Sequence, residues 1–439
     1  MPHPLRTLLL SALGVLMAAP LAAQAVSQAP AELSLLDAVR LGRHQAVTAT
    51  LANLNARVAS DKAGITRSAL LPQVSADGAI TPQTVNFEQF GFPGAIGVTP
   101  PFTLYALQLK ASQVIFDAAV IERLKAASDS VTVAGLDAQY AGSLAGTAAG
   151  LAYLRVLAAT ELVTARVADS AIAATLLAQA RQFQSAGVTP AIDLTRNEVN
   201  ARAVQSDLLT ARNELARARL DLLRLLNLPL DATLRLTDSL GAAPVDVPVE
   251  PDQAVAFALG HRTDVTAEAG RTEVARKNLR AVNNEYLPSL GFQGQYNWAG
   301  QQSDRLLGSY SLMFGVHIPV FDGLRRQRRA SEQSLRLEAQ QLREYDVQRQ
   351  AEQEVRRALL DLATAESAVS LATDRLALAT LELSQARERF DAGVVGSVET
   401  TQSQSVVVSA RNALIQARAS YGVARITLYQ ALGVLDRLQ

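Results

Sequence analysis

A run of 69 residues, from Leu324 to Ala392, contains neither glycine nor proline. As a single helix it would be roughly 100 Å long at 1.5 Å per residue. Helices in compact globular domains rarely exceed about 25 residues, so the run predicts a coiled coil or a similarly extended assembly. Apolar side chains recur every seven residues in it, at Val355, Leu362, Val369, Leu376 and Leu383.

The chain also contains two copies of one unit. The matched pairs begin with Ala38-Val39 and Ala254-Val255, then Leu71-Pro72 and Leu287-Pro288, both offset by 216 residues. Later pairs are Phe116-Asp117 with Phe321-Asp322, offset by 205, and 179–181 with 385–387, offset by 206. The offset changes once, between Pro72 and Phe116, so the first copy is longer in that segment only.

Each copy predicts one long helix flanked by two shorter ones. The expected shorter helices span 36–70 and 192–226 in the first copy, and 253–286 and 398–432 in the second. Gly187 and Gly393 follow the long helices, where a glycine with positive φ commonly ends a helix. Two shorter helices together equal one long helix in length, which favours stacking the two alongside it.

Two pairs of β-strands interrupt the helices. Apolar and polar residues alternate from Leu290 to Trp298 and from Tyr310 to Ile318, and more weakly near Val74 and Tyr105. Strands of about 10 residues with this alternation are typical of membrane barrels. The residues predicted to face lipid, with aromatic ones toward the loop end, are Tyr105, Leu107, Leu109, Leu290, Phe292, Tyr296, Trp298, Tyr310, Leu312, Phe314, Val316 and Ile318.

A soluble sheet with one face on a core is the alternative for these strands. Four strands cannot close a barrel, since eight is the usual minimum, and an open edge would leave backbone groups unpaired in lipid. If the strands span a membrane, the chain must therefore oligomerise. The residues themselves permit a dimer or a trimer.

The N-terminus has the pattern of an export signal. Arg6 precedes a short apolar run, and Ala23-Gln24-Ala25 places small residues where a signal peptidase cleaves, so we expect cleavage after Ala25. With no cysteine in the chain, we expect no N-terminal lipid anchor and no disulfide. Beyond the signal, the sequence shows no run of about 20 apolar residues, which predicts no transmembrane helix.

Composition and motifs set several functions aside. The formal net charge is zero, which gives no electrostatic case for a nucleic-acid partner. His44, His261 and His317 lie far apart and make no metal-ligand spacing, and we expect no cofactor. The arginines at 325, 326, 328 and 329 follow a strand, and we interpret them as a solvated or headgroup-proximal face.

With these features the chain resembles the TolC-like outer-membrane efflux protein family. The residues that carry the resemblance are 35–39, 71–72, 287–288, 320–323, 183–194 and 390–400. The resemblance implies a mainly α-helical homotrimer with a 12-stranded β-barrel in the outer membrane and a 12-helix tunnel across the periplasm. It implies a passive, non-enzymatic conduit that docks on a periplasmic adaptor and an inner-membrane pump.

The resemblance also implies roles at the helical turns. Adaptor docking is expected at Gly187, Val188, Thr189, Gly393, Val394 and Val395. Glu399 matches an acidic ring at the pore constriction, Gln402 stands where some members have a second acid, and Asp193 is the first-copy counterpart of Glu399. A first-turn carboxylate that stabilises the helix dipole is an equally good interpretation of Glu399, and the two are compatible.

The expected organisation follows from these observations. It is a signal at 1–25, a tail at 26–34, a first repeat at 35–230, a linker at 231–251 and a second repeat at 252–439. The β-hairpins are expected at about 73–116 and 289–320, and the helical turns at 187–191 and 393–397. The competing function is an exported structural or adhesive coiled-coil protein without a channel.

Overall fold

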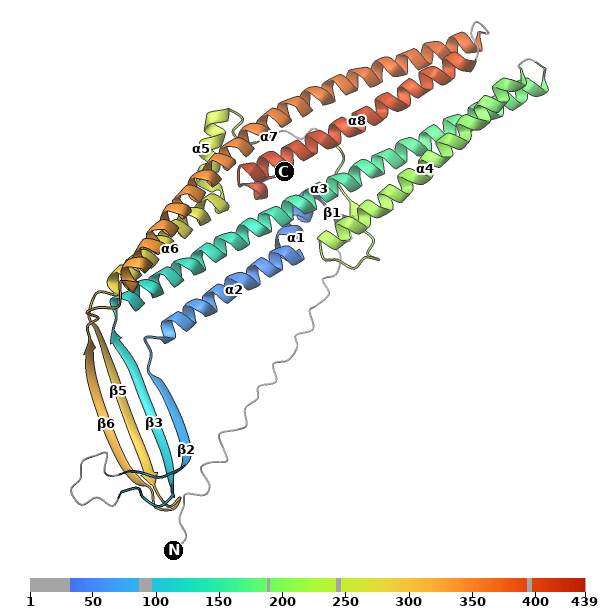
Figure 1. Ribbon diagram of the computed structural model, residues 1–439. Helices are drawn as coiled ribbons and strands as arrows, with labels where there is room; N and C mark the ends of the chain where they lie inside the picture. Colours follow the sequence, from blue (N-terminus) through green and yellow to red (C-terminus); the bar gives the residue numbers. More distant parts are fainter. Residues whose placement is uncertain (1–31, 87–96, 188–189, 242–245, 393–396, 439) are drawn as a thin grey trace.

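The computed structural model describes residues 32–86, 97–187, 190–241, 246–392 and 397–438. It is mostly helical, with one four-stranded sheet at one end and the ends of two helical hairpins at the other (Figure 1). The expected signal segment and the residues Val188, Thr189, Gly393, Val394 and Val395 lie outside the described residues.

Four helices form two long hairpins. They are α3 (Ala118–Ser185) with α4 (Ala191–Leu225), and α7 (Arg325–Asp391) with α8 (Ser397–Ala431). Gly187 has φ +74° after α3, a conformation that glycine adopts without a steric penalty. At the far ends of the hairpins, Asn227 follows α4 with φ +55° and Gly433 follows α8 with φ +75°. These two residues are 206 apart, so the two copies end their second helices in the same way.

The shorter helices that precede the strands are broken, where the sequence predicts continuous ones. The first copy has α1 (Leu35–Gln45) and α2 (Val47–Ser68), and the second has α5 (Pro251–His261) and α6 (Thr263–Asn284). The breaks fall at Ala46 (ψ 140°) and Arg262 (ψ 123°), which are equivalent positions 216 apart.

Burial of Arg262 explains the second break. Its guanidinium is 3% exposed and donates to Asp264 at 2.7 Å, to Glu354 at 2.6 Å and to the carbonyl of Ala431 at 3.3 Å. Burial lowers the pKa of Arg262, but the hydrogen bonds and charges of Asp264 and Glu354 outweigh this and raise it overall. These contacts join the start of α6 to α7 and to the end of α8.

The sheet has the order β2-β3-β5-β6, and all its pairs are antiparallel. Its strands are β2 (Gln73–Gln83), β3 (Phe102–Phe116), β5 (Ser289–Gly300) and β6 (Leu307–His317). Each second strand is followed by a long helix: β3 is separated from α3 by Asp117 alone, and β6 is connected to α7 by residues 318–324.

The hydrophobic core lies at mid-height of the helices, not along their whole length. There α3, α4 and α8 meet the parallel pair of β1 (Glu32–Leu33) and β4 (Arg235–Leu236) and the short 3₁₀ helix η2 (Leu435–Arg437). The side chain of Tyr153 is fully buried and donates to the Leu33 carbonyl at 3.0 Å. The segment expected to be a linker thus contributes a strand and apolar side chains to this core.

One described helix, α3, is long and apolar enough to cross a membrane by length and composition. The expectation of no transmembrane helix stays a prediction, because a core helix of a soluble protein meets the same two criteria. The apolar character of α3 comes from small residues that allow close packing: a Cβ added to Gly142, Gly146 or Gly150 would lie 3.0 Å from atoms of Arg43 or Val39 on α1.

Candidate functional site

The sheet separates apolar from polar side chains. Cross-strand partners point to the same face, and the pairs Leu109–Tyr296, Leu107–Trp298, Phe292–Phe314 and Leu290–Val316 join the apolar rows of the three strands. Tyr296 also pairs with Tyr310, and Tyr105 pairs with Ile80. Leu312 stands opposite Gly294 in the same row, while Ile318 lies just beyond the end of β6.

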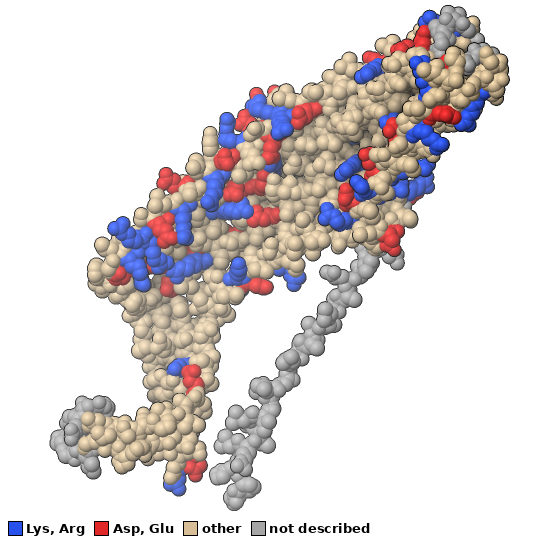
Figure 2. Space-filling view, turned by 45° about the vertical axis from the view of Figure 1, so that its right-hand side comes forward, with Lys and Arg blue, Asp and Glu red and all other residues tan. Residues whose placement is uncertain are grey.

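The apolar face is exposed in the single chain. Phe314 is 75% exposed, Tyr310 74% and Leu312 64%. Aromatic rings contact one another across it, with centroids 5.0 Å apart for Phe292 and Phe314 and 4.3 Å apart for Tyr296 and Trp298. In the space-filling view the sheet carries few charged side chains, in contrast to the helices (Figure 2). An apolar surface of this extent on a soluble monomer would be exceptional.

The opposite face is polar and hollowed. A groove of about 560 Å³ on the sheet is lined largely by polar residues, among them Gln73, Ser75, Lys110, Ser112, Gln293, Gln295 and Ser311. Lys110 and Asp77 form an ion pair at 3.2 Å. Gln108 donates to Gln295 at 3.2 Å on the same face. The sheet therefore has the inside-polar, outside-apolar arrangement of a barrel wall.

The helical wall is hollowed on one face as well. A groove of about 600 Å³ lies between α3, α6 and α7 and includes Asp137, Arg271 and Arg343. A second groove, of about 560 Å³, lies between α3, α4 and α8 and includes Arg155 and Arg217. The α3 residues of the two grooves share one helix face, and α1 packs on the other side of α3. The wall thus has one open face and one face covered at mid-height.

The two acidic residues expected at the helical turns both lie in the first turn of a helix. Glu399 accepts a hydrogen bond from Arg389, with 2.6 Å between the guanidinium Nη1 and Oε1. Asp193 lies 3.6 Å from Arg196, one turn further along α4. Gln402 is exposed. The structure therefore agrees with the helix-dipole interpretation of Glu399 and adds a basic partner from α7.

Sequence reasoning missed that partner. With the offset of 206, the first-copy equivalent of Arg389 is Phe183. This replacement of an aromatic residue by a basic one was the only sign in the sequence that Glu399 has a basic partner. The two hairpins also touch near their ends, where the rings of Phe183 and Phe390 are 6.4 Å apart. Further from the ends, the buried carboxylate of Asp169 accepts from Arg411 of α8 at 2.8 Å, which joins one hairpin to the other.

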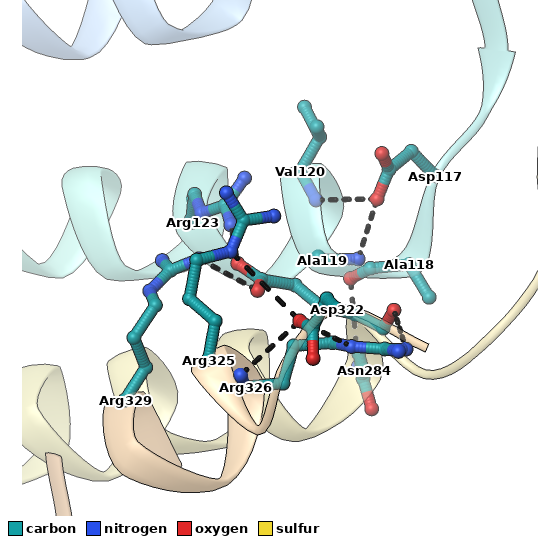
Figure 3. A network of polar contacts seen from close by, with 11 residues as sticks. Asp117, Ala118, Ala119, Val120, Arg123, Asn284, Asp322, Arg325, Arg326 and Arg329 are labelled. Atoms are coloured by element: carbon teal, nitrogen blue, oxygen red, sulfur yellow. Dashed lines mark hydrogen bonds and ion pairs between the residues drawn. The ribbon is translucent and has the colours of Figure 1, made fainter. Parts of the chain in front are cut away.

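A polar network holds the junction between sheet and helices (Figure 3). Asp117 caps α3 by accepting from the backbone N–H groups of Ala119 and Val120, at 2.8 and 3.0 Å. The equivalent Asp322 accepts from Arg326 Nε at 2.9 Å. Desolvation raises the pKa of Asp322, but the hydrogen bonds and charge of Arg326 outweigh it and lower that pKa below its ordinary value.

The expectation of a solvated arginine run was wrong for Arg326. This side chain is buried, donates to the carbonyl of Pro319 at 3.1 Å and lies 4.6 Å from the ring centroid of Tyr286. Arg329 instead pairs with Glu285 at 2.7 Å, and Glu285 also binds Arg123 of α3. Through Glu285, Arg329 of the second repeat is thus linked to Arg123 of the first repeat, next to the sheet. Arg325, with 74% of its side chain exposed, remains at the surface.

Comparison with known proteins relates the second copy of the repeat to a known family. Residues 255–434 match the family described as Outer membrane efflux protein. This match spans less than half of the chain and shows that its second copy is similar to TolC-like outer-membrane efflux proteins. Outer membrane efflux protein BepC of Brucella suis biovar 1 (strain 1330) is 26% identical over 194 residues. That alignment covers 43% of this chain and 42% of BepC, so it spans less than half of each protein.

Solved structures of outer-membrane channels share the fold over nearly the whole chain. The CmeC channel of Campylobacter jejuni matches with a TM-score of 0.81 at 15% identity, covering 91% of this chain and 86% of CmeC. VceC of Vibrio cholerae matches at 0.78 and 15% identity, covering 91% and 96%. The open state of MtrE of Neisseria gonorrhoeae matches at 0.71 and 19% identity, covering 91% and 89%.

Proposed function

We propose that this outer membrane efflux protein is the exit duct of a tripartite efflux or secretion system, and that it conducts cargo passively without catalysing a reaction. The observation that carries the proposal is the sheet, whose apolar face is exposed and whose polar face is hollowed, and whose second strands are followed by helices 68 and 67 residues long. Such helices would reach roughly 100 Å from the membrane.

In this proposal the apolar face of the sheet contacts lipid, and the grooved face lines the channel. Tyr105, Tyr296, Trp298 and Tyr310 lie together toward the loop end of the sheet and form the aromatic girdle at one membrane interface. The sheet then lies in the outer membrane and the helices extend into the periplasm. Export through the signal segment, cleaved after Ala25, delivers an unlipidated chain to that membrane.

The assembly is a homotrimer. The sheet has two open edges, β2 and β6, whose unpaired backbone groups would be costly in lipid. Three chains supply twelve strands, enough for a closed barrel, and the two long helical hairpins of each chain supply twelve helices around a tunnel. The helical edges support this closure, because Ile65 on α2 and Leu342 on α7 are 70% and 69% exposed.

The ends of the helical hairpins form the periplasmic entrance. The turns with Gly187, Val188, Thr189, Gly393, Val394 and Val395 dock on a periplasmic adaptor, which links the duct to an inner-membrane pump. Glu399, with Gln402 and Asp193 near it, lies at the constriction. A ring of carboxylates there attracts cations and repels anions.

Membrane fractionation tests this function against its competitor, an exported coiled-coil protein without a channel. The full chain should co-fractionate with outer membranes and migrate as a trimer on gels unless the sample is boiled. Recovery as a soluble protein from the periplasm would refute the channel. Isolation of the associated adaptor and pump from crosslinked cells then identifies the class of cargo.

A further inference from the structure

The boundary between the two copies inside the chain provides a template for the boundary between subunits. In each copy a first strand pairs with a second strand in the same register, as Gln73 with Ser112 and Ser289 with His317 show. The first strand of the second copy is therefore reached from that of the first copy by adding 216 to the residue number. The second strand is reached by adding 205. The internal pairing of β3 with β5 therefore translates into a pairing of β2 with β6 of the partner subunit.

The translated register keeps each face of the sheet uniform. The apolar pair Leu109–Tyr296 becomes Ile80 with Phe314 of the partner subunit. The pair Ala111–Gly294 becomes Gly78 with Val316 of the partner subunit, so a small residue again stands on one side. Both translated pairs lie on the apolar face, where Ile80 is 68% exposed in the single chain.

The helices below the sheet agree with the same translation. Inside the chain Gly270 of α6 accommodates Val133 of α3, since a Cβ on Gly270 would lie 2.7 Å from the Val133 side chain. With offsets of 216 for the shorter helices and 206 for the long helices, the translated pair is Leu54 with Ala339 of the partner subunit. Inside the chain the small residue is on α6, whereas across the subunit boundary it is on α7. In both cases one large and one small side chain share the helix contact, as close packing requires.

On the polar face the translation brings together a carboxylate and a histidine that are apart within one chain. The internal pair Ser112–Gln293 becomes Asp77 with His317 of the partner subunit. Asp77 already binds Lys110 at 3.2 Å, and both side chains of this pair are more than half exposed. His317 is exposed at the end of β6, the open edge of the sheet.

We infer that Asp77 and His317 of the partner subunit meet across each subunit boundary and, with Lys110, form a charged cluster on the channel side of the barrel. The site exists only in the assembly, because its residues come from β2, β3 and the β6 of a second copy of this chain. Three such clusters would face the lumen. This inference rests on the proposed trimer.

The chain contains no cysteine, so paired cysteines test the register directly. Directly opposed residues of antiparallel strands have Cα atoms about 4.5–5.5 Å apart, within the range of a disulfide. Asp77→Cys combined with His317→Cys should give covalent dimers and trimers on boiled, non-reducing gels after mild oxidation. Ile80→Cys with Phe314→Cys should do the same from the apolar face.

Two further double variants complete the experiment. Ser112→Cys with Gln293→Cys should crosslink within one chain without a change in size, which checks oxidation at the equivalent internal pair. Ala79→Cys with His317→Cys represents a register shifted by two residues and should crosslink at least tenfold less.

The outcomes separate two failures. Intact trimers on unboiled gels that give the internal crosslink, but none between positions 77 and 317 of neighbouring subunits, would overturn the inference alone. Preferred crosslinking of the shifted pair would overturn it too. A chain that is monomeric without any substitution would instead refute the proposed function.

Discussion

Inside the chain, α3 meets α6 through ion pairs, whereas the outer edges formed by α2 and α7 carry exposed apolar side chains. Asp129 binds Lys277, and Asp137 binds Arg271, both at 2.5 Å. With offsets of 216 and, for the long helices, 206, the translated positions are Asp61 with Leu335, and Asn55 with Arg343, neither of which is a pair of opposite charges. Leu335 is 62% exposed in the single chain.

The difference indicates that the α3–α6 boundary inside the chain and the α2–α7 boundary between subunits are stabilised in different ways. Partly exposed ion pairs contribute little net stability but fix which residues stand opposite each other. Apolar side chains contribute about 2 kcal/mol each when they are buried, and this gain requires only that a surface cover them. A chain with ion pairs at its internal boundary and exposed leucines at its edges therefore gains stability when its own copies cover those leucines.

The largest effect should follow from charges placed on the apolar edge. Leu335→Glu with Leu342→Glu puts carboxylates where the partner would bury leucines, so the trimer should be lost. The matched control is Thr132→Glu with Gln139→Glu, which places two carboxylates at the same spacing on an exposed face of α3. Unboiled gels and light scattering in detergent measure both, and a trimer that survives the leucine substitutions would show that α7 does not form the boundary.

The next effect concerns the two faces of one strand. Phe314→Arg places a charge on the proposed lipid face, at a cost of about 3 kcal/mol near mid-membrane. Its neighbour Met313 lies on the grooved face, where Met313→Arg should be tolerated. The yield of heat-modifiable trimer in outer-membrane fractions should fall for the first variant only. Equal loss in both would argue that the faces are not distinguished by lipid.

A smaller effect is expected where the two hairpins are joined. Asp169→Asn removes a carboxylate whose side chain is 4% exposed and leaves Arg411 without its 2.8 Å partner, at a cost of about 2 kcal/mol. Asp221→Asn is the control, since its contact with Arg155 is exposed and 3.7 Å long. Thermal denaturation of the trimer should shift by several degrees for Asp169→Asn and by less than one degree for the control, and equal shifts would contradict the buried link.

The smallest effect is at the hairpin ends. Glu399→Gln removes the proposed acidic ring and should lower the cation preference of the channel with little change in stability, because an exposed pair contributes less than about 1 kcal/mol. Arg389→Gln releases Glu399 from its partner and should raise that preference. Reversal potentials under a salt gradient measure both, and identical values for wild type and the two variants would remove Glu399 from the pore.

Strand alternation and helix length were readable from the sequence because each depends on local periodicity. The apolar residues from Leu290 to Trp298 share a face of the sheet because side chains alternate between the two faces of a strand, which is the periodicity on which the prediction rested. The break at Ala46 was not readable, since alanine favours helix and the bend accompanies packing at mid-height. Burial of Arg326 and the pairing of Arg389 with Glu399 likewise depend on residues that only the fold brings together.

Single-channel recording of the purified full chain in planar bilayers tests most directly whether copies of this sheet close into a water-filled barrel. Trimers that contain Glu399 should give discrete conductance steps with a preference for cations. A preparation shown by light scattering to be trimeric that gives no conductance steps would contradict barrel closure.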